Sequence, residues 1–462
     1  MDYDIIIIGS GPGGYVAAIR ASQLGLKTAV VEKKNVGGVC LNMGCIPTKS
    51  LMKSAQVFNY VKHAKEYGIQ IESAEADFPI VIKRSRMVAE RMSKGIEFLF
   101  KKNKIDVFEG IGEVSEKNTV SVKYNTGETK THTAQHIILA TGARSKELPH
   151  LKQDGKKIIG YKEALTMKEL PESMIVVGSG AIGTELAYFY NSMGTQVRLV
   201  EFLPYVLPNE DQEVSKQMGR SLKKQKIKVM TKASVESADT SGDKCQVVIK
   251  TKKGEETHEA DVVLSAVGVV PNTENFGDAL NDIVIEKGKV KVDDYYRTNI
   301  TGVYAIGDIV HGPALAHVAS AEGICCVEKI AGLDTEPVDY LNIPGGVFAE
   351  PEVASVGYTE EAVKDKGIEY KVGKFPFRAS GKAVGAGAPD GFVKLIYDKN
   401  DETLLGAHII GANATELIAE AVSIRRAGAK LHDLVKTIHP HPTMSEAVME
   451  AAADAADEAI HI

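Results

Sequence analysis

Two stretches of the chain repeat one glycine-rich pattern, at residues 9–14 and 178–183, and each follows a short apolar run. The first glycine of such a pattern permits a tight turn, the second lets a pyrophosphate approach the backbone, and the third lets a helix pack closely on a strand. The glycines expected to contact dinucleotides are Gly9, Gly11, Gly14, Gly178, Gly180 and Gly183. Each copy of the pattern predicts a strand, a turn and a helix whose N-terminus binds phosphate.

A second predicted strand follows each glycine pattern and ends in a glutamate, Glu32 in the first copy and Glu201 in the second. The separation from Gly9 to Gly178, and from Glu32 to Glu201, is the same 169 residues. A carboxylate at this position bonds ribose hydroxyls and repels a 2′-phosphate. No arginine follows Glu201, so the second dinucleotide is expected to be NAD, the alternative being a solvated strand end.

Two of the five cysteines, Cys40 and Cys45, lie behind the first glycine pattern. A zinc site would need a second pair of ligands, and a structural disulfide fits poorly in a chain without a secretory signal. The remaining interpretation is a dithiol that opens and closes during catalysis beside a cofactor that takes its electrons. A chance pair in a helix is the alternative. Cys325 and Cys326 are expected to be buried apolar residues, and Cys245 has no partner pattern.

Bulk composition narrows the class of protein. The chain has 462 residues, and a prior of roughly 150 residues per domain gives about three domains. A net charge of −6 argues against nucleic acid, and no apolar run reaches the ~18 residues of a membrane span. The acidic start, which enters a strand at once, favours an unprocessed cytoplasmic protein; a trimmed mitochondrial matrix protein would look the same.

Glycines and polar residues that end the apolar runs predict further elements of the fold. A buried strand at 136–140 ends at Thr141 and Gly142, and another at 304–306 ends at Gly307 and Asp308. Residues 109–112 are predicted to form a turn and residues 125–128 a hairpin. From about residue 347, alternating strands and then alanine-rich helices indicate a separate C-terminal domain.

Three segments carry a resemblance to a known family. Residues 37–49 resemble the redox-disulfide signature of the pyridine nucleotide-disulfide oxidoreductases. Residues 298–308 resemble the second FAD-binding motif of that family, and residues 439–446 its catalytic-base motif. The resemblance covers essentially the whole chain. Two positions differ from common family residues: Val39 stands where threonine is frequent and Val269 where arginine is frequent.

The resemblance implies an α/β fold with two Rossmann-like dinucleotide-binding domains, for FAD and NAD, and a C-terminal α+β dimerisation domain. The implied boundaries are 1–148 and 273–342 for the FAD domain, 149–272 for the NAD domain and 343–462 for the dimerisation domain. Beyond the glycines of the first pattern, the implied FAD-binding residues are Glu32, Lys49, Gly112, Thr141, Gly142, Asp308 and Ala316. Beyond those of the second, the implied NAD-site residues are Glu185, Glu201, Val235 and Gly268.

The implied activity is oxidation of protein-bound dihydrolipoamide to lipoamide through a redox disulfide and FAD, with reduction of NAD+ to NADH. The implied catalytic residues are Cys40, Cys45, His441 and Glu446, with His439 as an alternative base. His441 is expected to reach the dithiol of the other subunit of an obligate homodimer. The lipoyl group is expected to arrive on another protein, an acyltransferase of a 2-oxoacid dehydrogenase complex or a glycine cleavage carrier. A pair between Lys49 and Glu185 that tunes the flavin is a further hypothesis.

Two other interpretations compete with this one. Another FAD-dependent disulfide reductase, of the glutathione or mercuric type, is the alternative within the enzyme class. Glu201 without nearby arginines disfavours NADPH, and the C-terminus lacks the extra cysteine pair of mercuric and thioredoxin-type members. From another class, the chain could serve as a structural subunit docked on an acyltransferase core. No metal site is expected.

Overall fold

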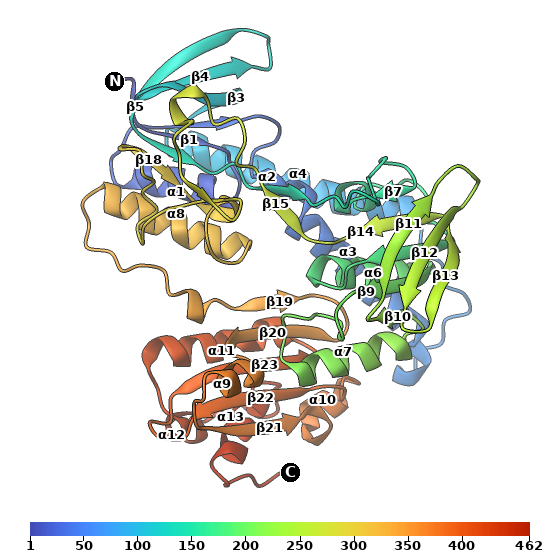
Figure 1. Cartoon of the computed structure of the whole chain (residues 1–462). Coiled ribbons are helices and arrows are strands. Elements are labelled where there is room, and N and C mark those ends of the chain that lie inside the picture. Colours follow the sequence, from blue (N-terminus) through green and yellow to red (C-terminus); the bar gives the residue numbers. More distant parts are fainter. The chain divides into compact units, whose positions relative to one another are not determined.

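The computed structural model describes residues 1–462 (Figure 1). It divides into two compact units. The first comprises Met1–Ser50, Ile80–Lys146 and Val269–Val338, and the second Leu51–Pro79, Glu147–Gly268 and Asp339–Ile462. The predicted four-part division of the chain stays a prediction.

The first unit is built on a parallel sheet with the strand order β3-β2-β1-β5-β18. Its strands are β1 (Tyr3–Ile8), β2 (Thr28–Glu32), the start of β3 (Asp106–Glu116), the end of β5 (Thr129–Leu139) and β18 (Val303–Ala305). The four isoleucines of β1 are at most 6 % exposed, as expected for a strand covered on both faces. Because these strands are parallel, their carboxyl ends open at one edge.

Helices α1 (Pro12–Gln23) and α8 (Ala316–Ile330) pack against each other in the first unit (Figure 1). Their contact is close because small residues face each other: a β-carbon on Gly323 would lie 2.7 Å from the carbonyl oxygen of Gly13. Cys325 and Cys326 of α8 are 4 % and 0 % exposed, which confirms the prediction that they are buried apolar residues.

Residues 109–112 do not form the predicted turn. They lie inside β3, whose second half pairs antiparallel with β4 (Thr119–Tyr124), which in turn pairs with β5. A β-carbon on Gly110 would collide with the backbone of β4, and one on Gly112 would lie 3.0 Å from the Val31 side chain. These glycines therefore permit close strand packing and do not reverse the chain. The hairpin predicted at 125–128 is confirmed.

The longer of the two internal segments outside the first unit, residues 147–268, is flanked by two paired strands of that unit. Strand β6 (Ala143–Ser145) pairs antiparallel with β15 (Val269–Pro271), Val269 lying opposite Ser145. Other elements of this unit are α2 (Gly38–Met43), most of α4 (Phe78–Lys102), β16 (Ile285–Glu286) and β17 (Lys289–Val290). Helix α3 (Cys45–Lys62) begins in this unit.

The second unit contains a parallel sheet with the order β10-β9-β8-β14-β7. Its strands are β7 (Ile158–Ile159), β8 (Ser173–Val177), β9 (Gln196–Glu201), β10 (Lys228–Thr231) and β14 (Val262–Ser265). Helices α5 (Tyr161–Ala164), α6 (Ala181–Met193) and α7 (Gln212–Lys224) accompany it, with an antiparallel sheet of β11 (Ser234–Asp239), β12 (Cys245–Thr251) and β13 (Gly254–Ala260). The order β10-β9-β8-β14 repeats the order β3-β2-β1-β5 of the first unit, with β8 in the place of β1. The predicted duplication therefore extends beyond the glycine-rich turns.

Residues beyond 343 form an antiparallel sheet in the order β19-β20-β23-β22-β21. Its strands are β19 (Gly345–Val347), β20 (Glu352–Gly357), β21 (Tyr370–Pro376), β22 (Phe392–Asp398) and β23 (Leu404–Gly411). The helices are α9 (Glu360–Asp365), α10 (Gly381–Gly385), α11 (Ala414–Ala427), α12 (Leu431–Val435) and α13 (Glu446–Ala455). Helices α11 and α13 pack on this sheet, and the alanines of α13 allow its close approach.

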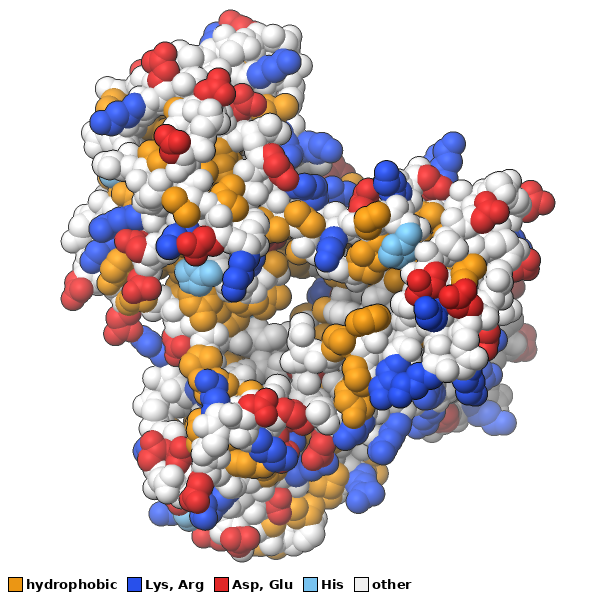
Figure 2. Space-filling model, in the orientation of Figure 1, with side chains coloured by type: hydrophobic (Ala, Val, Ile, Leu, Met, Phe, Trp, Pro, Cys, Tyr) orange, Lys and Arg blue, Asp and Glu red, His pale blue; other side chains and the backbone are white.

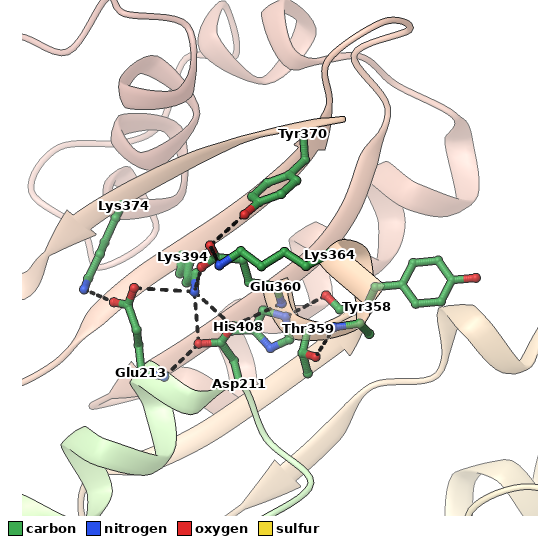
Figure 3. A network of polar contacts seen from close by, with 11 residues as sticks. Asp211, Glu213, Tyr358, Thr359, Glu360, Lys364, Tyr370, Lys374, Lys394 and His408 are labelled. Atoms are coloured by element: carbon green, nitrogen blue, oxygen red, sulfur yellow. Dashed lines mark hydrogen bonds and ion pairs between the residues drawn. The ribbon is translucent and has the colours of Figure 1, made fainter. Parts of the chain in front are cut away.

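A row of polar side chains crosses this sheet, one from each of four neighbouring strands: Ser355, His408, Lys394 and Lys374 lie opposite one another in register. Lys394 is fully buried, and its Nζ lies 2.9 Å from Asp211 Oδ2 and 2.6 Å from Glu360 Oε2 (Figure 3). Asp211 caps the N-terminus of α7. The row thus ties α7 to the C-terminal sheet through ion pairs.

The surface carries mixed charge. On the face shown in Figure 2, acidic and basic side chains are interspersed with apolar ones. None of the helices combines the length and the apolar character that crossing a membrane requires.

Candidate active site

The first glycine-rich turn joins β1 to α1 at the carboxyl edge of the first parallel sheet. Gly9 has φ 107°, in the left-handed region that favours glycine, and a β-carbon on Gly14 would overlap the carbonyl oxygen of Gly9. The space around Gly11, at the N-terminus of α1, is open. Free backbone N–H groups and the helix dipole favour an anion there, so the geometry is that of a phosphate-binding turn.

Glu32, at the end of β2, is held by three donors. The backbone N–H and the hydroxyl of Ser10 donate to its Oε2, at 3.0 and 2.6 Å, and the N–H of Lys34 donates to its Oε1 at 2.9 Å. The carboxylate therefore lies beside the glycine turn at the edge where the strands end, next to the place predicted for a ribose.

Three further predicted FAD-binding positions lie at the same edge, because they follow parallel strands. Thr141 and Gly142 follow β5 and are clamped by Asn272, whose side-chain amide donates to the Thr141 carbonyl at 2.9 Å and whose N–H donates to the Gly142 carbonyl at 2.8 Å. Asp308 follows β18, and burial raises the pKa of its carboxyl. Ala316 begins α8 and Gly112 lies on β3.

The second glycine-rich turn repeats this geometry in the second unit. Gly178 has φ 97°, and a β-carbon on Gly183 would overlap its carbonyl oxygen. The space around Gly180 is open. Ser179 donates to Glu201 Oε2 from its N–H at 2.8 Å and from its hydroxyl at 2.7 Å, and the N–H two residues beyond Glu201 donates to Oε1 at 2.8 Å. The two turns are the same site built twice.

The other residues predicted near NAD have different surroundings. Glu185 is 3 % exposed on α6, and its Oε1 accepts a hydrogen bond from the N–H of Phe348 at 2.9 Å. The Val235 side chain is buried in the core between the two sheets. Gly268 lies beyond the carboxyl end of β14 with φ 105° and open space around it. The role of these three residues at the NAD site stays a prediction.

Cys40 and Cys45 face each other across the junction of α2 and α3. Both thiols are half-buried. A β-carbon on Gly44 would lie 2.9 Å from the carbonyl oxygen of Val39, so this tight junction requires glycine. The hydrogen bond with Cys45, followed by burial, raises the pKa of the Cys40 thiol far above its usual value, and the charge of Lys49 opposes that shift. The two sulfurs are therefore close enough to interact directly.

His441 and Glu446 lie together at the start of α13. His441 Nδ1 is 2.8 Å from Glu446 Oε1, and the N–H of Thr443 donates to Oε2 at 2.8 Å. Burial alone would raise the pKa of Glu446, but the Thr443 N–H and His441 outweigh burial and lower it. The imidazole side chain is 80 % exposed, so a fixed carboxylate orients a ring that can take up a proton from outside.

His439, the alternative base, has no ring nitrogen to spare. Its Nδ1 lies 3.0 Å from the Thr437 carbonyl oxygen, its Nε2 lies 2.7 Å from Glu420 Oε1, and its side chain is 6 % exposed. The structure therefore favours His441 as the group that meets a substrate.

Two nucleotide-binding turns, a paired dithiol and a carboxylate-oriented histidine define a class of enzyme in which a thiol pair exchanges electrons with bound dinucleotides. Residues 3–323 match the pyridine nucleotide-disulphide oxidoreductase family, and residues 343–452 match the dimerisation domain of these enzymes. The chain belongs to the pyridine nucleotide-disulphide oxidoreductases.

Individual relatives are more specific. A dihydrolipoyl dehydrogenase from Rhizobium etli is 46 % identical over 98 % of this chain and 98 % of its own length. Another from Bacillus subtilis is 42 % identical over 100 % of this chain and 99 % of its own length. The crystal structure of LpdA from Mycobacterium tuberculosis superimposes with a TM-score of 0.90 at 27 % identity, covering 97 % of this chain and 98 % of that one.

These comparisons confirm the predicted family, the α/β fold with a dimerisation domain, the oxidoreductase class and the use of FAD and NAD. The dimerisation domain supports the predicted homodimer.

Sequence reasoning missed two kinds of residue at the site. Ser10 and Ser179 hold Glu32 and Glu201, and their identical place in both glycine patterns was the available signal. Tyr15 lies beside the dithiol: burial, then the charges of Cys40 and Cys45, raises the pKa of its hydroxyl. Only its position directly after Gly14 pointed to it.

Proposed function

We propose that this chain is a dihydrolipoamide dehydrogenase, which oxidises protein-bound dihydrolipoamide to lipoamide and reduces NAD+ to NADH. The observation that carries the proposal is the paired thiols of Cys40 and Cys45 next to Lys49, in the unit that holds the first nucleotide-binding turn. The near-full-length similarity to dihydrolipoyl dehydrogenases supports this substrate over the disulfides of glutathione-type enzymes.

The reaction begins with a proton transfer. Dihydrolipoamide carries two thiols, and only a thiolate attacks a disulfide efficiently. We assign His441 as the base: Nε2 takes the thiol proton, while Glu446 holds Nδ1 and stabilises the imidazolium. Because the dithiol and His441 come from different parts of the fold, and because the family dimerises, His441 of one subunit serves the dithiol of the other.

Disulfide exchange follows from the oxidised form of the cysteine pair. The substrate thiolate attacks Sγ of Cys40, a substrate–Cys40 bond forms, and the Cys40–Cys45 bond breaks, which leaves Cys45 as a thiolate. The second substrate sulfur, after losing its proton, attacks the first; lipoamide closes and Cys40 leaves and is protonated. The substrate loses two electrons and two protons, and the cysteine pair gains the two electrons.

The nucleotide sites fit the cofactors that this reaction needs. The open, glycine-lined helix N-termini at Gly11 and Gly180 accept pyrophosphate, and the carboxylates of Glu32 and Glu201 accept ribose hydroxyls. The first turn would hold FAD, together with Thr141, Gly142 and Asp308, and the second would hold NAD. When bound, FAD supplies the two-electron relay between a dithiol and NAD+.

The proposed partner is a protein that carries a covalently attached lipoyl group, such as an acyltransferase core or a glycine cleavage carrier. The near-full-length relatives include both bacterial and mitochondrial enzymes. Both the cytoplasm and the mitochondrial matrix therefore fit the proposal.

The test is a substrate comparison on the purified holoenzyme. Dihydrolipoamide with NAD+ is expected to yield NADH rapidly, and glutathione disulfide with NADPH is expected to turn over poorly. Turnover of the second pair but not the first would refute the substrate and move the assignment to a glutathione-type reductase.

Two variants sharpen the test. Cys45→Ser is expected to abolish NADH formation while FAD binding and assembly persist, because serine cannot form the disulfide. Cys245→Ser is the matched control, since its Sγ lies 3.8 Å from the Asp261 carbonyl oxygen, to which a hydroxyl can also donate. Persistent NADH formation in Cys45→Ser would refute the dithiol mechanism.

A further inference from the structure

The carboxylates of Glu32 and Glu201 are oriented in the same way by a serine of the glycine-rich turn. In each pair the serine precedes the glutamate by 22 residues and supplies two of three donors, its N–H and its hydroxyl, both to Oε2. The third donor, to Oε1, is the N–H two residues after the glutamate. This agreement extends the duplication from the fold to single hydrogen bonds.

Burial makes these contacts consequential. Ser10 and Ser179 are both 0 % exposed, and Glu32 and Glu201 are 9 % and 7 % exposed. Water has little access to replace a lost hydroxyl, and an unsatisfied acceptor at a buried site is unfavourable. Three donors occupy three of the roughly four acceptor positions of a carboxylate, so one position on Oε1 remains for a ligand hydroxyl.

We propose that Ser10 and Ser179 are positioning residues that hold the ribose-binding carboxylates in the orientation each dinucleotide requires, Ser10 for FAD and Ser179 for NAD. The inference rests on the proposed placement of the two cofactors. The hydroxyls act before the ligand arrives: a carboxylate already fixed in its binding orientation loses little freedom when a ribose hydroxyl docks. A freed carboxylate would have to be ordered by the nucleotide itself.

The two serines differ in one contact. The hydroxyl of Ser10 also accepts a hydrogen bond from the N–H of Gly37 at 3.2 Å, at the start of the segment that carries Cys40. Ser10 therefore links the first glycine-rich turn to the start of α2, the helix that contains Cys40. Replacement of Ser10 removes both of these hydrogen bonds. We therefore expect it to weaken FAD retention more than loss of the bond to Glu32 alone would.

The test compares Ser10→Ala and Ser179→Ala in the holoenzyme by equilibrium binding. Ser179→Ala is expected to raise the dissociation constant for NAD+ about tenfold in calorimetric titration, which equals ~1.4 kcal/mol, and to leave FAD content unchanged. Ser10→Ala is expected to speed the release of FAD, followed by flavin fluorescence in mild chaotrope, and to leave NAD+ affinity unchanged. Each variant serves as the control for the other.

Ser265→Ala is a second control. Ser265 ends β14 in the same sheet as the second turn, is 3 % exposed, and its hydroxyl has no hydrogen-bond partner. It is expected to leave NAD+ affinity at the wild-type value. Equal NAD+ affinities in Ser179→Ala and Ser265→Ala would overturn the proposal. Equally weakened binding of both FAD and NAD+ in Ser10→Ala and in Ser179→Ala would also overturn it, because that result means general destabilisation of the protein.

Measurements of NAD+ and FAD binding test the role of the two serines without any dithiol substrate. A wild-type protein that fails to bind NAD+ would overturn it. Absence of dihydrolipoamide turnover in a wild-type protein that binds both cofactors would refute the proposed function alone, and the serine variants would still separate as described.

Discussion

At the scale of single residues, the two histidines at 439 and 441 show how position decides availability. Both carry the same ring, and only one residue separates them in the chain. His439 contacts acceptors with both nitrogens and is 6 % exposed, whereas His441 is oriented by one carboxylate and is 80 % exposed. A base must present a nitrogen to its substrate, so only His441 is suited to the role.

The corresponding prediction concerns proton transfer. His441→Gln is expected to lower kcat with dihydrolipoamide by about 10²–10⁴-fold, the usual loss when a general base is removed, with little change in thermal stability. Steady-state kinetics and a melting curve measure both quantities. His432→Gln is the matched control, because His432 is also an exposed histidine paired with carboxylates. Equal activities in the two variants would contradict the assignment.

At the scale of elements, the polar row of the C-terminal sheet joins strands to a helix by charge. Lys394 is fully buried on β22 between Asp211, at the start of α7, and Glu360, on α9 (Figure 3). Burial alone would lower the pKa of Lys394, but its bonds to Glu360 and Asp211 outweigh burial and raise it. The buried pair of Lys394 and Asp211 is costly to break, because removal of the lysine leaves the Asp211 carboxylate charged and buried.

Lys394→Met is expected to lower the free energy of unfolding by roughly 3–5 kcal/mol, since the buried carboxylate of Asp211 loses its cation and the partly buried carboxylate of Glu360 loses one of two. Lys374→Met is the matched control on the neighbouring strand: Lys374 is 40 % exposed and pairs with Glu213, so a loss of about 0–1 kcal/mol is expected. Urea unfolding of the holoenzymes measures both. Equal losses would show that burial of the pair contributes nothing.

The pH dependence of stability follows from Glu360. Burial would raise its pKa, but hydrogen bonds with Lys364, Lys394 and Tyr370 outweigh burial and lower it from 4.5 to about 2. A depressed carboxylate pKa contributes stability that is complete above pH 4.5 and is lost as the pH falls toward 2.

The stability difference between wild type and Glu360→Gln is therefore expected to be constant near neutral pH and to shrink by about 1 kcal/mol at pH 4. Unfolding curves across this range measure it. Glu361→Gln, at the next position of the same helix, is the control for loss of a charge alone. A difference that stays constant down to pH 4 would contradict the shift.

At the scale of the whole molecule, catalysis is expected to need two copies. The chain carries the dimerisation domain of its family, and the dithiol and the base lie in different units of the chain. If each base serves the thiols of the other subunit, two different inactive variants complement each other in a hybrid dimer.

Equal amounts of Cys45→Ser and His441→Gln subunits, dissociated and reassembled together, are expected to regain about a quarter of wild-type activity. Half of the dimers are then hybrids, and each hybrid has one intact site. NADH formation before and after mixing measures the gain. No gain, with hybrids demonstrated by a tag on one variant, would place the dithiol and its base in one subunit.

Local patterns predicted the nucleotide-binding units because glycines at fixed spacing specify backbone geometry directly. The same reasoning failed at residues 109–112, where glycines serve close strand packing. The serine contacts escaped prediction because the role of Ser10 depends on where the chain returns 22 residues later. The row at Lys394 was out of reach for a similar reason: its members come from four strands, and only the register brings them together.

The paired strands β6 and β15 have a consequence for modularity. The segment 146–268 follows β6 and precedes β15, and Val269 lies directly opposite Ser145, so the two ends of this segment lie side by side. A segment joined in this way can be exchanged for another with the same end spacing without rethreading its host. The junction of β6 and β15 is therefore the place where a nucleotide-binding segment with a different coenzyme preference can be inserted, provided that it keeps the ion pair of Asp211 with Lys394.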